Sequence, residues 1–257
     1  MASSRTIGWL VVAGLLVGAV LASSVPGAAD PMRLRLENLS TGVGVVITDN
    51  GAGDLDLTLG SIVASPALGL GATIAIGTSI PPLTGAGSVL NLNGVVIALS
   101  PVSVRFFLEN DDYVGGSSVA GLIGGTLQAG TGSTIALQSW LNPANLVPDL
   151  GADVPIPGAL PAYTVPAGSL PLFGPAVFGP GAFADSETEP FTAVGAYSLF
   201  AEGTITFAGS GVLTATFSDT QAVVTPEPGS MVLLGVGLIA LALLPVLRRA
   251  GRRQRGI

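Results

Sequence analysis

Met32-Arg33-Leu34-Arg35-Leu36-Glu37 carries an apolar side chain at every second position, with charged side chains between them. This period of two is typical of a β-strand that has one buried face and one polar face. The same alternation recurs in Asp54-Leu55-Asp56-Leu57-Thr58-Leu59. We therefore expect both stretches to be strands, with their leucines in the core and the two arginines directed outward.

Ten further segments have a strand-like composition, and most are bounded by Gly, Asn, Asp or Pro. They are residues 43–48, 73–78, 89–93, 95–99, 102–109, 126–128, 134–140, 196–200, 204–207 and 213–218. No stretch between residues 30 and 224 has a comparable helical period. The pattern predicts an all-β fold, an antiparallel β-sandwich, and a solenoid is less favoured because the sequence has no fixed repeat. The expected inner layer is Leu55, Leu57, Leu59, Val104, Phe106, Leu213 and Phe217.

A proline-rich segment interrupts this rhythm. Residues 141–190 contain ten of the nineteen prolines. Because proline cannot donate a ladder hydrogen bond, the segment contains no central strand. Its phenylalanines, Phe173, Phe178 and Phe183, favour an extended insertion packed over the sandwich in polyproline II stretches. A disordered tract and an exposed binding loop are the alternatives.

The N-terminus has the pattern of a secretory signal peptide. Arg5 provides a positive charge, residues 7–22 are apolar, and small residues follow up to Ala29. We expect signal peptidase to cleave after Ala29, which removes residues 1–29. A permanent membrane anchor is the alternative.

The C-terminus has three parts in a fixed order. Pro226-Glu227-Pro228 is followed by an apolar run over residues 231–247 and then by an arginine cluster: Arg248, Arg249, Arg252, Arg253 and Arg255. As a helix, the apolar run would reach roughly 25 Å, slightly short of a bilayer core of about 30 Å, so it would span one only marginally. The arginines would stay on the cytoplasmic side, so the preceding chain would lie outside. An ordinary single-pass anchor is the simpler alternative.

This order of motif, apolar span and arginines resembles the PEP-CTERM sorting signal of bacterial proteins associated with exopolysaccharide. The resemblance covers residues 225–257 and departs from the usual pattern only at Thr225, where Val is frequent. It implies recognition by an exosortase, cleavage near Pro226-Glu227-Pro228 and loss of the transmembrane helix. The protein would then pass from a transient inner-membrane anchor to the cell surface or the extracellular space.

The region before the tail resembles an uncharacterised, β-rich ectodomain found in other PEP-CTERM proteins. The resemblance rests on Arg33-Leu34-Arg35-Leu36, residues 48–54, Ala196-Tyr197-Ser198-Leu199, Gly209-Ser210-Gly211 and Phe217. It implies one continuous β domain over residues 30–224 and no assigned activity.

Removal of both ends leaves a strongly acidic chain. Between Asp30 and Glu227 lie all sixteen carboxylates but only three arginines, Arg33, Arg35 and Arg105, which gives a net charge of −13. Such a surface disfavours nucleic acid and anionic lipid as partners. The sequence contains no cysteine, so its stability depends on a hydrophobic core rather than on disulfides.

The sequence also lacks histidine and lysine. The commonest general base, the thiolate nucleophile, the usual zinc ligands and a Schiff-base amine are therefore missing. Two carboxylate groups could in principle serve a glycosidase: Glu109 with Asp111-Asp112, and Asp185, Glu187 and Glu189. Adjacent carboxylates on loops are far more often solvated turns, so we predict that the protein is not an enzyme.

One acidic turn could bind calcium. Asp49, Asn50, Asp54 and Asp56 combine oxygen-bearing side chains with flexible glycines, as a calcium ion requires, although the spacing is not that of an EF-hand. The simpler interpretation is a hairpin whose Asn50-Gly51 forms a type I′ turn between residues 45–47 and 55–59. A second calcium site at residues 109–112 is less favoured.

Two functional hypotheses follow. The first is a structural protein of an extracellular polysaccharide or biofilm matrix, with exosortase and signal peptidase as its partners during export. The second is a calcium-dependent adhesin or carbohydrate-binding module. The first is preferred because sugar sites usually present aromatic platforms, and Trp140 is the only tryptophan outside the predicted signal peptide.

Overall fold

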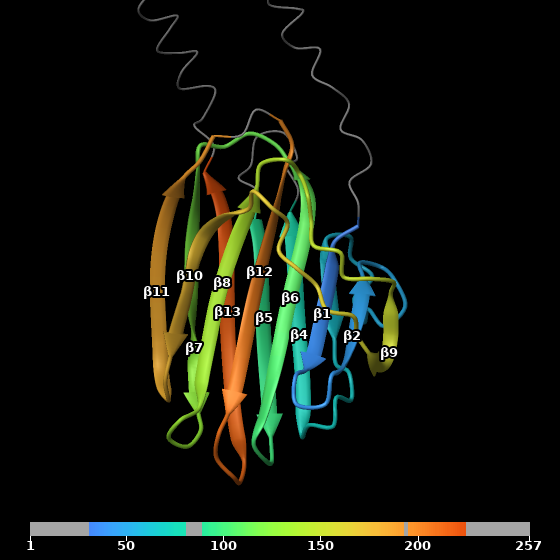
Figure 1. The fold of residues 1–257 in the computed structure, drawn as a ribbon, viewed down its shortest axis with the longest axis vertical. Helices are drawn as coiled ribbons and strands as arrows, with labels where there is room; N and C mark the ends of the chain where they lie inside the picture. Colours follow the sequence, from blue (N-terminus) through green and yellow to red (C-terminus); the bar gives the residue numbers. More distant parts are fainter. Residues whose placement is uncertain (1–30, 81–88, 193–194, 225–257) are drawn as a thin grey trace, which may run out of the picture.

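The computed structural model of the protein describes residues 31–80, 89–192 and 195–224, which form two antiparallel β-sheets packed face to face (Figure 1). These residues contain no helix. The predicted all-β class and the two antiparallel sheets are thus confirmed. The predicted signal peptide, residues 1–29, and the predicted sorting segment, residues 225–257, lie outside the described residues.

The seven-stranded sheet, called sheet A here, has the order β10-β8-β12-β6-β1-β2-β9. Its strands are β1 (Arg33–Asn38), β2 (Val43–Thr48), β6 (Val102–Tyr113), β8 (Thr134–Asn142), β9 (Val154–Ala159), β10 (Leu170–Phe178) and β12 (Tyr197–Phe207). The six-stranded sheet B has the order β11-β7-β13-β5-β4-β3. Its strands are β3 (Ser61–Ala64), β4 (Ala72–Ile80), β5 (Val89–Ala98), β7 (Ser118–Gln128), β11 (Gly181–Pro190) and β13 (Leu213–Val224).

Two pairs of predicted strands are joined in the structure. Residues 89–93 and 95–98 belong to the single strand β5, and residues 197–200 and 204–207 both belong to β12. Glycine at the expected boundary does not end either strand. Instead, Gly94 and Gly203 leave room for the ring of Phe217, because a Cβ at either position would lie closer than 3.0 Å to that ring.

The core between the sheets includes four of the predicted inner residues. Val104 and Phe106 from β6, and Leu213 and Phe217 from β13, are all buried. The rings of Phe106 and Phe217 meet edge to face with centroids 5.0 Å apart, which ties the centre of sheet A to the centre of sheet B.

The other three predicted core residues are exposed. Leu55, Leu57 and Leu59 have relative exposures of 68%, 80% and 87%, because residues 54–59 form a loop before β3 rather than a strand. The Asp54 side chain accepts a hydrogen bond from the Asp56 amide, and the Asp56 side chain accepts one from the Thr58 amide, each at 3.0 Å. These local bonds hold turns in the backbone and compete with pairing to a neighbouring strand.

The proline-rich segment supplies three strands, and each lies at the edge of a sheet. β9 and β10 end the two sides of sheet A, and β11 ends one side of sheet B. Proline is tolerated there because an edge strand has one side without ladder bonds. Phe173 is buried, while Phe178 and Phe183 stack with centroids 4.5 Å apart and pack against the main core. The segment is therefore packed, and about half of it is paired in strands rather than forming an unpaired extended insertion.

A carboxylic acid is buried in β13. Asp219 has no exposed surface, and the Gln221 side-chain amide donates to it. Burial raises the pKa of Asp219 to about 7, and the Gln221 hydrogen bond opposes that rise. The described core is thus apolar with a polar inclusion near the middle of its last strand.

Substitutions at one core residue and one loop residue test the burial of Phe217 and the placement of residues 54–59 in a loop. Phe217→Ala should lower the free energy of unfolding by about 3–5 kcal/mol, because it removes a buried ring from a slot that two glycines shape. Leu57→Ala should change it by less than about 0.5 kcal/mol, since that side chain is exposed. Chemical denaturation of the mature protein measures both. Similar losses in the two variants would contradict the placement of residues 54–59 in a loop.

Candidate functional site

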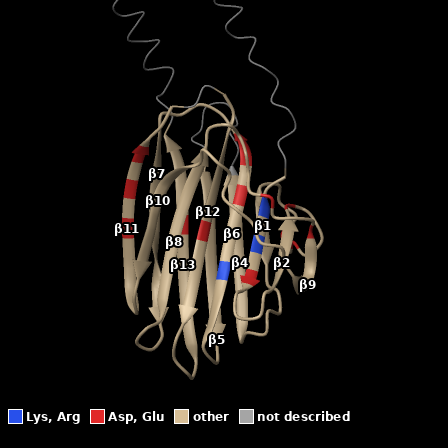
Figure 2. Ribbon diagram, viewed as in Figure 1, with Lys and Arg blue, Asp and Glu red and all other residues tan. Residues whose placement is uncertain are grey.

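All three arginines of the described residues lie on the outer face of sheet A, the face turned away from sheet B. Figure 2 shows them in blue on β1 and β6. Arg33 and Arg35 point away from the main core, as predicted, but Arg35 is only 1% exposed. The prediction that it faces solvent is wrong, because a second layer covers this face.

The second layer is residues 143–169, called the crossing segment here. It leaves β8, runs to β9 at one edge of sheet A, and returns to β10 at the opposite edge (Figure 1). Its side chains form a second hydrophobic core with the outer face of the sheet. That core consists of Val46, Phe107, Leu150 and Phe200, with Trp140, Leu160, Tyr163 and Val165 packed against it.

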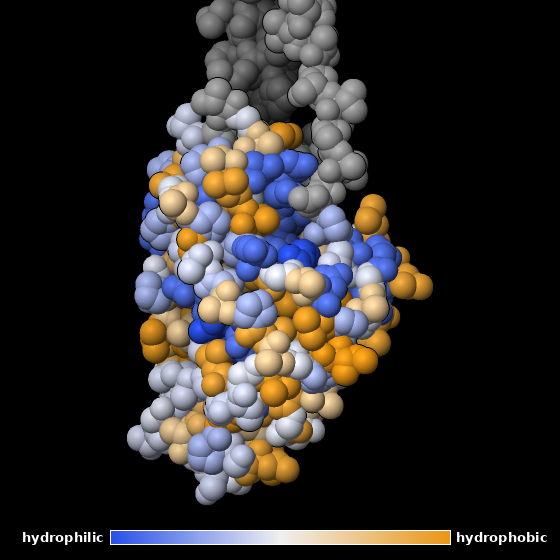
Figure 3. Space-filling view, turned by 45° about the vertical axis from the view of Figure 1, so that its right-hand side comes forward, coloured by the Kyte–Doolittle hydropathy of each residue, from blue (hydrophilic) through white to orange (hydrophobic). Residues whose placement is uncertain are grey.

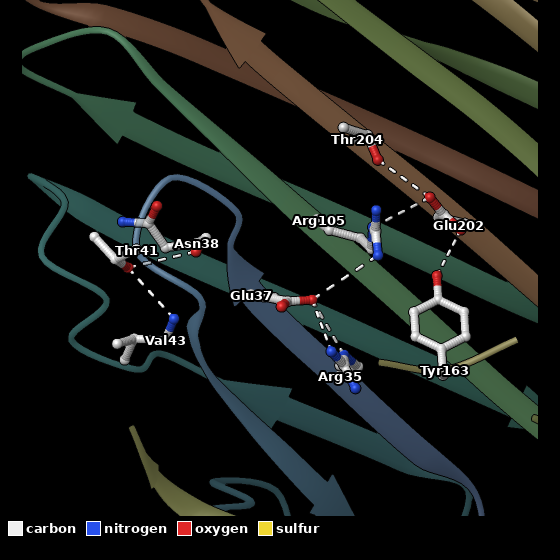
Figure 4. Close-up of polar contacts among 9 residues, drawn as sticks. All are labelled: Arg35, Glu37, Asn38, Thr41, Val43, Arg105, Tyr163, Glu202 and Thr204. Atoms are coloured by element: carbon white, nitrogen blue, oxygen red, sulfur yellow. Dashed lines mark hydrogen bonds and ion pairs between the residues drawn. The ribbon is translucent and has the colours of Figure 1, made fainter. Parts of the chain in front are cut away.

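Two arginines and two glutamates form a network beneath the crossing segment (Figure 4). Strand register places Glu37 opposite Arg105. Glu37 Oε2 lies 2.8 Å from Arg35 Nη2 and 3.9 Å from Arg105 Nη1. Arg105 Nε lies 3.4 Å from Glu202 Oε1. The four charges balance, which reduces the cost of burying them.

Tyr163 of the crossing segment closes this network. Its hydroxyl donates to Glu202 Oε2 at 2.6 Å (Figure 4). The guanidinium carbons of Arg35 and Arg105 lie 5.0 and 5.5 Å from its ring centroid, within the range of cation–π attraction. Burial raises the pKa of Tyr163, with Glu202 contributing, so the hydroxyl remains a donor. We interpret the network as the anchor of the crossing segment rather than as a binding site.

Beside the network, the same face opens into an acidic cleft of about 280 Å³. It is lined by Pro31, Arg33, Thr48, Glu109, Asn110, Asp111 and Val147. Figure 3 shows hydrophilic residues gathered on the upper part of this side of the domain. The cleft brings together residues from β1, β2, β6 and the crossing segment, so only the folded chain assembles it.

Glu109 is the deepest acid of the cleft. It is 2% exposed, and its Oε1 lies 3.8 Å from Arg33 Nη1. Burial raises the pKa of Glu109 to about 8, Arg33 opposes that rise, and Asp111 and Asp149 add to it. A buried carboxyl group with such a pKa in a cleft is typical of functional sites, although ion-pair networks produce it as well.

The sequence interpretation of residues 109–112 as a solvated turn is wrong. β6 continues to Tyr113, and both Glu109 and Asp111 are buried. Asp112 has a left-handed backbone with φ of 57°, and its carboxylate accepts a hydrogen bond from Asn145 at 2.7 Å. Asp112 thus holds the crossing segment against the end of β6.

The other acidic group, Asp185, Glu187 and Glu189, lies on the edge strand β11 and not on a loop. Alternation along the strand directs all three side chains to one side. A hydrogen bond with Glu189 is the main cause that raises the pKa of Glu187. Like charges on an edge strand oppose pairing with another chain, which gives this group a structural role.

The predicted calcium ligands occupy the loop between β2 and β3. Asp54 accepts hydrogen bonds from the amides of Asn50, Asp56 and Val63, each at 3.0 Å, and Asp49 accepts one from Gly60 at 2.7 Å. Asn50 has φ of 57°, the left-handed conformation expected of a turn. Within the described ranges, no group of three or more acidic residues has the arrangement of a metal site. The carboxylates thus organise the loop, and calcium binding here stays a prediction.

The sorting segment begins where the last strand ends. Val224 pairs with Ser118 of β7, and its carbonyl accepts a hydrogen bond from the Ser117 amide at 3.1 Å. β13 is a central strand of sheet B, between β7 and β5. Pro226, Glu227, Pro228 and the arginine cluster lie outside the described residues. No helix in the part of the chain that the structure describes is long and apolar enough to cross a membrane.

Fold and sequence together define a β-sandwich ectodomain with a C-terminal sorting signal. That signal is a PEP-CTERM protein-sorting motif, since the family of that description matches residues 224–249. The predicted recognition is thereby confirmed, and the match implies export and processing by an exosortase.

Solved structures give only faint similarity to the chain. The adhesin domain of Epf from Streptococcus pyogenes has a TM-score of 0.29 at 10% identity, over 74% of this chain and 57% of that one. The K2 cleaved adhesin domain of Lys-gingipain has a TM-score of 0.22 at 13% identity, over 58% of this chain and 88% of that one. These scores are too low to support a functional argument. No curated protein matches the chain.

The role of Tyr163 can be tested by removing its hydroxyl. Tyr163→Phe should lower the free energy of unfolding by about 1.5–3 kcal/mol, because it deletes a hydrogen bond to a carboxylate. Tyr197→Phe is the matched control, since the Tyr197 hydroxyl has no hydrogen-bond partner among the described residues. Urea unfolding measures both, and limited proteolysis should cut the crossing segment faster in Tyr163→Phe. Equal stability of the two variants would refute the anchoring role.

Proposed function

We propose that this protein is a non-catalytic structural component of the cell surface or of an extracellular polysaccharide matrix, delivered there by signal peptidase and exosortase. The observation that carries the proposal is the PEP-CTERM motif directly after the last strand of the ectodomain. The sorting machinery would therefore receive a complete β-sandwich, with residues 1–29 removed at one end and the segment after Val224 processed at the other.

The chemistry of the chain supports a non-catalytic role. The sequence contains no histidine, cysteine or lysine, and most of its described carboxylates serve loops, the arginine network or an edge strand. The exceptions are Glu109, Asp111 and Asp112 near the end of β6, and Asp219 in the core. Each of the three arginines makes an ion pair on the outer face of sheet A. What faces water is therefore acidic and hydroxyl-rich, a surface suited to many weak polar contacts with hydrated polysaccharide.

Mass spectrometry of the exported protein tests the processing. We expect no peptide from Met231 onward, because exosortase cleavage near Pro226-Glu227-Pro228 would separate that segment. Deletion of residues 225–257 should release the domain into the periplasm or medium. An extracellular product that still contains a peptide ending at Arg255 would refute processing, whereas a protein found only in the cytosol would refute the extracellular role.

A calcium-dependent adhesin is the second candidate function. Its support is the mutual repulsion of Asp49, Asp54 and Asp56: burial is the first cause that raises the pKa of Asp49, and the two neighbouring charges add to it. A divalent cation would relieve that repulsion. Trp140 gives little support to carbohydrate stacking, because its ring lies against Phe200 with centroids 5.5 Å apart.

Thermal unfolding with calcium and with a chelator distinguishes the two candidates. The matrix proposal predicts the same melting temperature in both conditions. An adhesin would melt several degrees higher with calcium, since a ligand that binds only the native state stabilises it. Asp49→Asn should then abolish the shift, and Glu187→Gln, on the distant edge strand β11, should not. A shift with this pattern would replace the first candidate by the second.

A further inference from the structure

The outer face of sheet B, which is turned away from sheet A, has no charged side chain among its described strand residues. The strands of this sheet contain only four charged residues: Asp219 of β13 and Asp185, Glu187 and Glu189 of β11. Asp219 is buried in the core. The three acids of β11 are on the same side of the strand as Phe183, which packs against the main core. A strongly acidic chain thus keeps one whole face free of charge, as the centres of protein interfaces are.

Five aliphatic side chains adjoin one another on this face: Val63, Ile74, Ile76, Val95 and Ile97, called the aliphatic patch here. Strand register sets Ile74 opposite Val95, and Ile76 opposite Val63. Ile97 lies two residues beyond Val95 and therefore on the same face. Ile74, Ile76 and Val95 have relative exposures of 41%, 37% and 40%. Contiguous exposed apolar side chains of this kind mark interaction surfaces.

The polar side chains beside the patch are hydrogen-bonded to one another. The hydroxyl oxygens of Thr126 and Thr216 lie 3.0 Å apart, and the Thr220 hydroxyl donates to the Asn91 side chain at 3.2 Å. Polar groups that are already paired cost less to remove from water. Short side chains also lose little rotamer freedom when a partner covers them. The face is therefore prepared for burial.

The size of the face suits a stable interface. Sheet B has six strands, and four of them, β5, β7, β11 and β13, are 10 to 12 residues long. With about 4.8 Å between strands and about 3.3 Å per residue, the face measures roughly 24 by 33 Å, or about 800 Å². A standard protein–protein interface buries about this area on each partner.

The distribution of charge favours a second copy of the chain as the occupant. Other surfaces of the domain carry acids, such as the row on β11 and the cleft around Glu109, and these would repel the same surface of another copy. Two copies that meet through sheet B bring no carboxylates of its strands together. A sugar is disfavoured, because the aromatic residues of the described strands of sheet B, Phe183 and Phe217, are directed toward the core.

We propose that the outer face of sheet B binds the same face of a second copy, with the two aliphatic patches buried in the interface. Because one face serves both copies, a twofold axis relates them and the assembly closes as a dimer. The pairing concerns the ectodomain alone, so it does not depend on whether the sorting segment is removed.

Sedimentation equilibrium of the exported protein measures the pairing, and we expect a dimer that dissociates on dilution. Val95→Glu places a carboxylate within the patch. It should raise the dissociation constant at least about 100-fold, because each copy would bury an unpaired charge. Ile156→Glu is the matched control, since Ile156 is an exposed aliphatic residue on the edge strand β9 of the other sheet. It should leave the dissociation constant unchanged.

A protein that stays monomeric at concentrations up to about 0.1 mM would overturn the proposal. A dimer that Val95→Glu leaves intact, or that Ile156→Glu weakens equally, would overturn it too. So would a monomer that binds a neutral glycan such as dextran and loses that binding in Val95→Glu, because the face would then have a different occupant.

A second measurement needs no mutation and holds if Val95→Glu fails to fold. In a mixture of ¹³C-labelled and unlabelled protein, isotope-filtered NMR detects only contacts between different copies. We expect such contacts at the methyl groups of Ile74, Ile76 and Val95. Intermolecular contacts confined to other surfaces would overturn the proposal.

Discussion

The outer face of sheet A carries charged and apolar side chains that need a second layer over them. The course of the crossing segment, residues 143–169, follows from this constraint. The outer face carries every arginine of the described ectodomain together with an apolar patch around Phe107 and Phe200. The crossing segment covers both kinds of surface at once, with Leu150 and Leu160 over the apolar part and Tyr163 over the charges. Its run from β8 to β9 contributes Val147 to the wall of the acidic cleft, and it leads to β9 and then to β10 at the two edges of the sheet.

Periodicity in the sequence predicted the fold where side-chain chemistry and strand geometry agree. In β1, β6 and β13, β-branched, aromatic and leucine side chains alternate with polar ones, and each of these strands forms. The same period of two wrongly predicted a strand at residues 54–59. There the alternating polar residues are Asp54 and Asp56, which bond to backbone amides two residues ahead and stabilise turns. An alternating pattern built on aspartate is therefore a weaker strand signal than one built on arginine or threonine.

The sequence predicted the acidic residues of the candidate sites but not their environment. Glu109 and Asp111 follow an apolar run, which suggested that the strand ends and the acids enter water. They remain in β6 because its outer face is buried as well, and that burial comes from Val147 and its neighbours, far along the chain. No local pattern contains that information. The sorting motif, in contrast, was recognisable at once, because its order of proline, apolar span and arginine is read along the chain itself.

The position of β13 has a consequence for how the domain stands on a cell. Only six residues separate Val224 from the start of the apolar run at Met231, so the tether reaches at most about 25 Å when fully extended. A strand clamped between two neighbours cannot lengthen that tether by unravelling at little cost. If the apolar run anchors the chain before release, as proposed, the C-terminal end of β13 would stay within about 25 Å of the lipid. The β5–β6, β7–β8 and β12–β13 hairpins lie at the opposite end of the sandwich from Val224, so they would be far from this attachment and free to meet an approaching polymer (Figure 1).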